Sequence, residues 1–168
     1  KMNSTVGFPS CALVGSSGLL SYTRLGRTID EAALVVRVND APVLNYTAIV
    51  GTETELRVIN TETFTRLEGG YCHLSSAFDG RAWWCPRYAV YLNMYWQVCR
   101  DAFRQACGSV TPLILDRNNV FVKGEEHAQL LDELTPDHKN YMSGSVAIVL
   151  ATMLCPRGVD VYGFTHVA

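Results

Sequence analysis

Two polar stretches of the sequence directly follow apolar runs, where a strand would end and a ligand could bind. Ser16 and Ser17 lie between two glycines after residues 11–14. Small residues let a ligand approach the main chain, so N–H groups and hydroxyls here can satisfy phosphate or sugar oxygens. Asn39 follows residues 33–38, and its amide offers donors and an acceptor to a base or ribose. For each stretch, an ordinary turn is the alternative.

A third stretch, Ser143, Gly144 and Ser145, precedes the apolar run VAIVLATML. That run is too apolar all round for a surface helix, so we expect a buried helix that begins at these residues. Unpaired N–H groups and the helix dipole would make its start an anion site without a metal ion. A serine that only caps the helix is the alternative.

The motifs of several enzyme classes are missing. Ser21 occupies the position of the third glycine of a dinucleotide-binding loop, and no nucleophile elbow, zinc-protease helix or phosphate-binding P-loop occurs. No Asp-x-Asp pair suggests a metal-held diphosphate. Of the four histidines, only His166 follows the end of an expected strand, so it is a weak candidate for a catalytic group. A terminal surface residue is the alternative reading of His166.

Apolar runs and stripes predict the elements that would position these residues. The expected strands are residues 11–14, 33–38, 54–59, 113–115, 120–122 and 159–164, and the expected helices are 91–106, 125–134 and the run after 143. Residues 19–32 are irregular or helical, and 61–87 are rich in turns. Strands that alternate with helices predict an α/β fold with a largely parallel sheet.

The composition bounds the class of protein. The 168 residues are 48% hydrophobic and 18% charged with a formal net charge of -2, which predicts a single domain over 1–168 and disfavours nucleic acid as a partner. The chain contains no run long enough to span a membrane and no signal peptide, so it is not expected to contact a membrane itself.

Cysteines and glycosylation sequons indicate a compartment. Six cysteines lie at 11, 72, 85, 99, 107 and 155 without a C-x-x-C pair, which argues against a zinc ribbon and for disulfides or core thiols. Asn3 and Asn45 each begin an N-x-S/T sequon. Because glycans and disulfides form in the same compartment, we expect a lumenal or extracellular setting.

Two segments together resemble a known family. CALVGSSGLL at 11–20, with Ile29-Asp30, VVRVNDAP at 35–42 and VGTET at 50–54, resembles the large sialylmotif of the animal-type sialyltransferases. SGSVAIVLATMLC at 143–155, followed by VDVYGF, is similar to the small sialylmotif.

The resemblance implies a fold and an activity. The fold would be a GT-A-like variant, a Rossmann-like, largely parallel sheet flanked by helices. The donor substrate would be CMP-sialic acid, the acceptor a glycan hydroxyl, and the transfer inverting, with no metal ion and no other cofactor. The full-length protein would be a single-pass type II membrane protein in the Golgi lumen, with its anchor before the catalytic domain.

Carried over residue by residue, the resemblance assigns donor nucleotide binding to the positions of Ser16, Asn39, Ser143 and Gly144. With the neighbouring hydroxyls of the same two polar stretches, the predicted donor nucleotide site consists of Ser16, Ser17, Asn39, Ser143, Gly144 and Ser145. It implies a disulfide between Cys11 and Cys155. Ser16 stands where the family usually has an asparagine, which shortens the reach to a nucleotide. The catalytic histidine base of the family is expected beyond Ala168, so the 168-residue chain alone is expected to be inactive.

Three alternatives remain at this point. The protein could transfer another CMP-activated acid sugar, or it could be a non-catalytic lumenal domain that binds a nucleotide or glycan with the same fold. A generic nucleotide-binding α/β domain would have no Cys11–Cys155 bridge. The acceptor sugar, its linkage, the oligomeric state and the pairing of Cys72, Cys85, Cys99 and Cys107 are left open.

Overall fold

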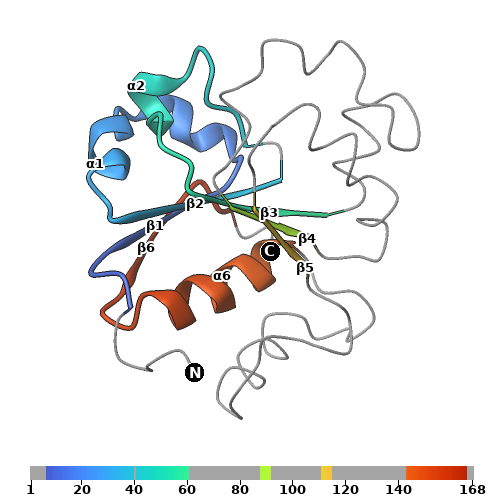
Figure 1. Ribbon diagram of the computed structural model, residues 1–168. Helices are drawn as coiled ribbons and strands as arrows, with labels where there is room; N and C mark the ends of the chain where they lie inside the picture. The colour runs from blue at the N-terminus through green and yellow to red at the C-terminus, as the bar shows by residue number, and fades with distance from the viewer. Residues whose placement is uncertain (1–6, 40, 61–87, 92–110, 115–142, 166–168) are drawn as a thin grey trace, which may run out of the picture.

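The computed structural model describes residues 7–39, 41–60, 88–91, 111–114 and 143–165. Within these residues, six strands form one sheet in the order β5-β4-β3-β2-β1-β6, and every neighbouring pair is parallel (Figure 1). The strands are β1 (Cys11–Val14), β2 (Leu34–Val38), β3 (Leu56–Ile59), β4 (Tyr88–Tyr91), β5 (Thr111–Ile114) and β6 (Val159–Tyr162). The expected α/β fold with a parallel sheet is therefore confirmed.

Helices cover both faces of this sheet. Figure 1 shows the 3-10 helix η1 (Gly18–Tyr22), α1 (Gly26–Asp30) and α2 (Thr47–Val50) on one face and α6 (Ser143–Leu154) on the other. Central strands β1, β2 and β3 are buried throughout, which explains their nearly continuous apolar sequences. Side chains alternate between faces along each strand, so one strand contributes to two cores.

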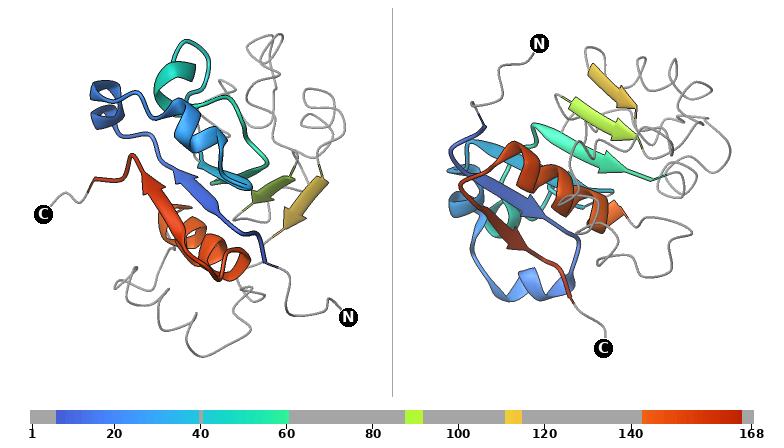
Figure 2. Two further views of the ribbon diagram at one scale, coloured as in Figure 1. Left: turned by 90° about the vertical axis from the view of Figure 1, so that its left-hand side faces the viewer. Right: turned by 90° about the horizontal axis from the view of Figure 1, so that it is seen from below.

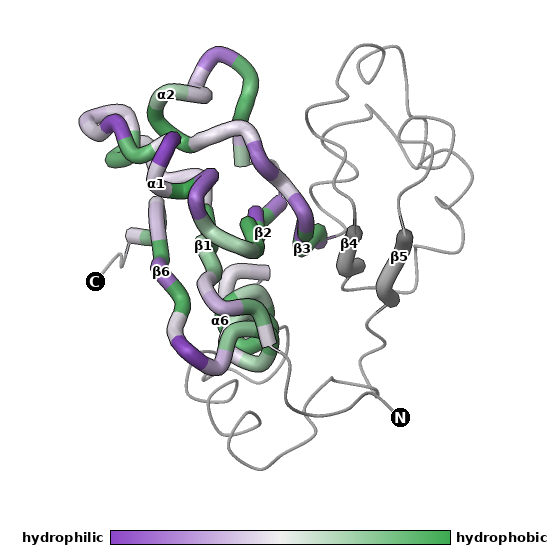
Figure 3. The backbone as a smooth tube through the Cα atoms, turned by 60° about the vertical axis from the view of Figure 1, so that its left-hand side comes forward, coloured by the Kyte–Doolittle hydropathy of each residue, from purple (hydrophilic) through white to green (hydrophobic). Residues whose placement is uncertain are grey.

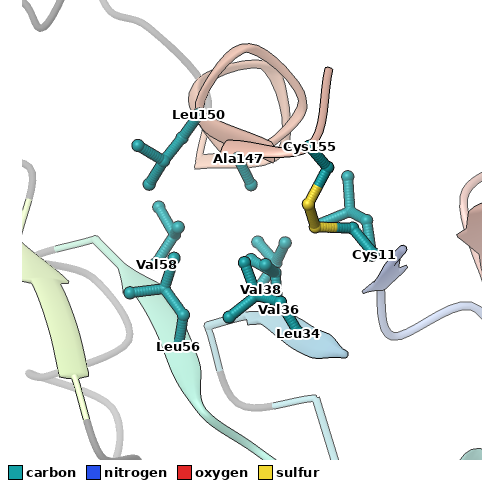
Figure 4. Close-up of a cluster of buried hydrophobic side chains, with 10 residues drawn as sticks. Cys11, Leu34, Val36, Val38, Leu56, Val58, Ala147, Leu150 and Cys155 are labelled. Carbon is teal, nitrogen blue, oxygen red and sulfur yellow. A yellow bond between two sulfur atoms is a disulfide. The ribbon is translucent and has the colours of Figure 1, made fainter. Parts of the chain in front are cut away.

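The core beneath α6 joins three strands to the helix. It consists of residues from β1, β2, β3 and α6 and the cysteine after it (Figure 4): Cys11, Leu13, Leu34, Val36, Val38, Leu56, Val58, Ala147, Leu150 and Cys155. The hydropathy colouring in Figure 3 shows α6 as mostly apolar, as its sequence predicts. No helix in the described part of the chain is both long and apolar enough to cross a membrane.

A disulfide ties α6 to the first strand. Cys11 in β1 is bonded to Cys155, just after α6, with their Cα atoms 6.0 Å apart (Figure 4). Both cysteines are buried in the core beneath α6. The bridge that the family resemblance implied is thus present, and it links segments 144 residues apart in the sequence.

The element boundaries agree with the sequence in most of the described chain. The strand expected at 54–59 begins at Leu56, and the strand expected at 159–164 ends at Tyr162, before Gly163 with its φ of 69°. The helix expected from Tyr91 was wrong at its start, because Tyr91 ends strand β4. The strand expected at 120–122 and the helix expected at 125–134 lie outside the described residues.

Candidate functional site

The loop after β1 and the loop after β6 meet at one edge of the sheet. All pairs are parallel, so the carboxyl ends of β1, β2, β3 and β6 lie at this edge (Figure 2). The Gly15 N–H donates to the Tyr162 carbonyl at 2.8 Å, and the Ser17 N–H donates to the Gly163 carbonyl at 3.0 Å. Strand β1 pairs with β2 on one side and with β6 on the other, so the order of the strands reverses at β1. Open α/β sheets bind their ligands at such a point.

Phe164 connects this edge to the start of α6. A Cβ atom added at Gly144 would lie 3.2 Å from Cε1 of the Phe164 ring, and one at Gly15 would lie 3.1 Å from Cδ2. The ring therefore packs on two glycines from the two sequence motifs, and it is 37% exposed. Sequence analysis placed Phe164 inside the expected strand 159–164 and missed its role, although its position at the carboxyl end of that strand was a usable signal.

Two serines at the start of α6 are buried. Ser143 is 4% and Ser145 5% exposed. In the described part of the chain, the Ser143 Oγ atom is buried without a hydrogen-bond partner. A buried hydroxyl without a partner costs about 1–3 kcal/mol, and a ligand oxygen would remove that cost. The twelve-residue helix also directs its first N–H groups to this end, which suits an anionic group.

Asn39 follows β2 at the same edge of the sheet and has a φ of 50°. Asparagine adopts this left-handed conformation more readily than other residues with side chains. Its N–H donates to the Val58 carbonyl at 2.8 Å, and its Oδ1 accepts from the Asn60 N–H at 3.0 Å. Asn39 therefore has the turn role that the sequence analysis gave as the alternative. Its side-chain –NH₂ is the group that a ligand could still use.

The two serines after β1 differ in their surroundings. Ser16 is exposed, whereas Ser17 is partly buried and caps η1 by accepting a hydrogen bond from the Leu19 N–H at 3.3 Å. Gly18 has open space where a Cβ would be added. This loop therefore offers Ser16 and backbone groups to a ligand, while the Ser17 hydroxyl serves the helix cap.

Two arginines lie fully buried in β2 and β3, in register with each other, and sequence analysis missed both. The Arg57 Nη1 donates to the carbonyl of Asn39 at 2.6 Å and to that of Ala41 at 3.3 Å. Arg37 instead donates to the Val50 and Glu53 carbonyls, each at 2.8 Å from Nη2. The only signal was a single arginine inside each apolar strand.

The Arg37 charge has partial compensation. Burial lowers the pKa of Arg37 to about 10, while the carboxylates of Asp30, Glu55 and Glu53 act in the opposite direction. The guanidinium is still charged at neutral pH. It holds the segment before β3, and the Asp30 carboxylate holds the same segment by accepting the Thr52 N–H at 2.8 Å and the Glu53 N–H at 2.9 Å. These motif residues therefore stabilise the fold and do not face the candidate site.

Of the remaining residues that the sequence singled out, Asn45 is described by the structure and the others are not. Asn45 is exposed in the turn before α2, with a φ of 69°, so its sequon is accessible. His166, Asn3 and the cysteines at 72, 85, 99 and 107 lie outside the described residues. Among the described residues, no three His, Cys, Asp or Glu side chains are grouped so that they could hold a metal ion.

Comparisons of the sequence point to one family. The family model "Glycosyltransferase family 29 (sialyltransferase)" matches residues 2–79. The beta-galactoside alpha-2,6-sialyltransferase 1 of Mus musculus is 30% identical over 162 residues, which are 92% of this chain and 40% of that protein. The beta-galactoside alpha-2,6-sialyltransferase 2 of Xenopus tropicalis is 44% identical over 59 residues, 35% of this chain and 11% of that protein. The chain thus spans less than half the length of these relatives.

Solved structures share the fold. The crystal structure of a mammalian sialyltransferase superposes with a TM-score of 0.61 and 19% identity, over 97% of this chain and 57% of that one. The crystal structure of a mammalian sialyltransferase in complex with Gal-beta-1-3GalNAc-ortho-nitrophenol superposes with a TM-score of 0.60 and 21% identity, over 94% of this chain and 56% of that one. The matched family, the relatives along nearly the whole chain and the shared fold agree, so the chain belongs to the sialyltransferases of glycosyltransferase family 29 as a divergent member.

Proposed function

We propose that the full-length protein transfers sialic acid from CMP-sialic acid to a hydroxyl of an acceptor glycan in the Golgi lumen. The donor nucleotide would lie at the carboxyl edge of the sheet, between the loop after β1, Asn39 and the start of α6. The observation that carries the proposal is the unpartnered, buried Oγ of Ser143 at the start of α6. It stands where two sequence motifs meet around Phe164.

The charge of the ligand fits the groups available. A nucleoside monophosphate carries its charge on phosphate oxygens, which helix N–H groups and hydroxyls bind well. Ser143, Ser145 and the Gly144 backbone would receive the phosphate, because they lie at the start of α6. Asn39 would contact the nucleoside through its –NH₂ group, and the exposed face of Phe164 offers an apolar surface next to the phosphate site. Ser16 and the Ser17 backbone would complete the site.

The reaction would be a single displacement. A base removes the proton of an acceptor hydroxyl, whose oxygen attacks the anomeric carbon of sialic acid as the bond to the CMP oxygen breaks. CMP leaves with the bonding electron pair, and attack opposite the leaving group inverts the anomeric centre. Donors at the start of α6 stabilise the charge that develops on the phosphate, which makes a metal ion unnecessary. A histidine has a suitable pKa for the base, and we place this base outside the described residues.

Calorimetric titration of the full-length protein with CMP tests the site. We expect saturable binding by the wild type, and Ser143→Ala should weaken it about tenfold, the factor that one hydrogen bond carries. Thr152→Ala is the matched control, because the Thr152 hydroxyl on the same helix donates to the Val149 carbonyl and lies away from the proposed site. Its affinity should equal that of the wild type. Absence of saturable CMP binding would overturn the proposal.

Product analysis tests the reaction itself. Incubation with CMP-sialic acid and a galactose-terminated acceptor should give a sialylated product with inverted anomeric configuration, and EDTA should leave the rate unchanged. Competition by other CMP-activated acid sugars separates the proposed donor from related donors. CMP binding without any transfer by the full-length protein would instead identify a non-catalytic binding domain.

A further inference from the structure

We infer that Arg57 is a positioning residue for the donor site: from within the sheet it fixes the conformation in which Asn39 meets the nucleotide. This inference rests on the function proposed above. The Arg57 side chain is 0% exposed, so it reaches neither donor nor acceptor directly. Its effect must pass through the main chain that it binds.

Two hydrogen bonds of Arg57 go to the turn that contains Asn39. Its Nη1 donates to the Asn39 carbonyl at 2.6 Å and to the Ala41 carbonyl at 3.3 Å, so one cationic group binds both sides of the turn. Hydrogen bonds from a buried charged group are shorter and stronger than neutral ones, so they hold the position of the carbonyls that accept them. The Ala41 N–H also donates to the Val38 carbonyl at 3.1 Å, which keeps this turn tight.

Within the described residues, the hydrogen bonds that hold Asn39 come from β3 and from Asn60 directly after it. Its N–H is bound by Val58, its carbonyl by Arg57 and its Oδ1 by Asn60. These three hydrogen bonds hold the left-handed φ of 50° and orient the carboxamide. Only the Arg57 contact uses a side chain of β3, so it is the anchor that a substitution can remove while the parallel ladder is kept.

Arg37 provides a matched control within the same sheet. Its Cα is in register with that of Arg57, and both side chains are fully buried. Arg37 binds Val50 and Glu53, which lie before β3, whereas Asn39 and Asn60 follow their strands at the opposite edge. Loss of either arginine removes a buried charge from the fold, but only loss of Arg57 should reach the donor site.

The experiment compares Arg57→Met and Arg37→Met in the full-length protein. Both should unfold at lower urea concentration than the wild type. Arg57→Met should raise the Kd for CMP and the KM for CMP-sialic acid about tenfold, with the acceptor KM unchanged, whereas Arg37→Met should leave both donor constants within about twofold. In hydrogen exchange, Arg57→Met should also lose protection at the Asn60 amide, which donates to Asn39. If Arg57→Met does not fold, Arg57→Lys and Arg37→Lys are compared instead. Arg57→Lys should then raise the Kd and the donor KM by a smaller factor, and Arg37→Lys should leave both unchanged.

The outcomes separate the two proposals. If the wild type binds CMP and the Arg57 variant binds it equally tightly, the inference about Arg57 is overturned while the function stands. Equal loss of CMP affinity in both arginine variants would also overturn it, because the effect would then be general destabilisation. If the wild type shows no CMP binding at all, the proposed function fails, and this inference fails with it.

Discussion

Arg37 shows at the scale of one residue how a motif position can serve the fold instead of a ligand. Burial lowers its pKa to about 10, so the unfolded chain binds this proton more tightly than the folded one. Its contribution to stability therefore rises with pH only above about pH 10, and at pH 6 to 8 both states keep the proton. Below pH 10, the cost of burying this charge is constant.

This linkage gives a prediction for Arg37→Met. The substitution leaves the carbonyls of Val50 and Glu53 without their donor, so the free energy of unfolding should fall by about 3 kcal/mol. The loss should be equal at pH 6 and pH 8. Urea denaturation at both pH values measures it, and a loss that depends on pH in this interval would contradict the assignment of a permanently charged Arg37.

Asn45 gives a second prediction at the residue scale. Its side chain is exposed and the turn before α2 is accessible, so Asn45 should carry a glycan when the protein passes through a secretory pathway. Thr47→Ala should remove this glycan while keeping Asn45, whose φ of 69° suits asparagine. Mass spectrometry of glycosidase-treated peptides measures occupancy. An unmodified Asn45 in the wild type, or a glycan retained in the Thr47 variant, would refute the prediction.

The candidate site could be predicted from sequence where a residue is chemically conspicuous, and not where it works through the main chain. The serines of α6 and Asn39 could be named as candidates because they precede or follow apolar runs. Arg57 was missed because a charged residue inside an apolar strand gives no sign of which carbonyls it will bind. Those acceptors depend on a parallel register that only the folded sheet defines.

At the scale of elements, the close approach of α1 and α2 depends on glycine. A Cβ added at Gly26 would overlap the Thr47 carbonyl oxygen and lie 2.9 Å from the Gly51 nitrogen. Gly26→Ala should therefore push the helices apart and lower the free energy of unfolding by about 1–3 kcal/mol. Gly18→Ala, with open space around its Cβ, should change it by less than about 0.5 kcal/mol. Urea denaturation compares the two, and equal effects would show that close packing of α1 and α2 is unimportant.

Elements were predictable where the hydrophobic pattern matches their burial. The nearly continuous apolar runs of β1 and β2 and the apolar stretch of α6 correspond to the layers they occupy. Strand β4 was missed because it is only four residues long and its last residue, Tyr91, was assigned to the helical stripe that begins there. These four residues form a strand because they pair with β3. The periodicity of a short segment carries no information about such a distant partner.

At the scale of the whole molecule, the disulfide joins the two motifs on which the site depends. Cys11 and Cys155 close a loop of 144 residues, and a loop of this length stabilises by up to about 5 kcal/mol in the chain-entropy model. The bridge lies in the core beneath α6, so it also fixes the end of that helix against β1. Because α6 begins at Ser143, its attachment to the sheet determines where the proposed phosphate site lies.

The double variant Cys11→Ala/Cys155→Ala should consequently lose about 3–5 kcal/mol of unfolding free energy in urea at 25 °C. Reduction of the wild type should shift its denaturation midpoint toward that of the variant. The same reductant added to the double variant measures what any other disulfides contribute, so the difference between the two shifts belongs to this bridge. A reductant shift of equal size in both proteins would mean that the Cys11–Cys155 bond does not stabilise the sheet against α6.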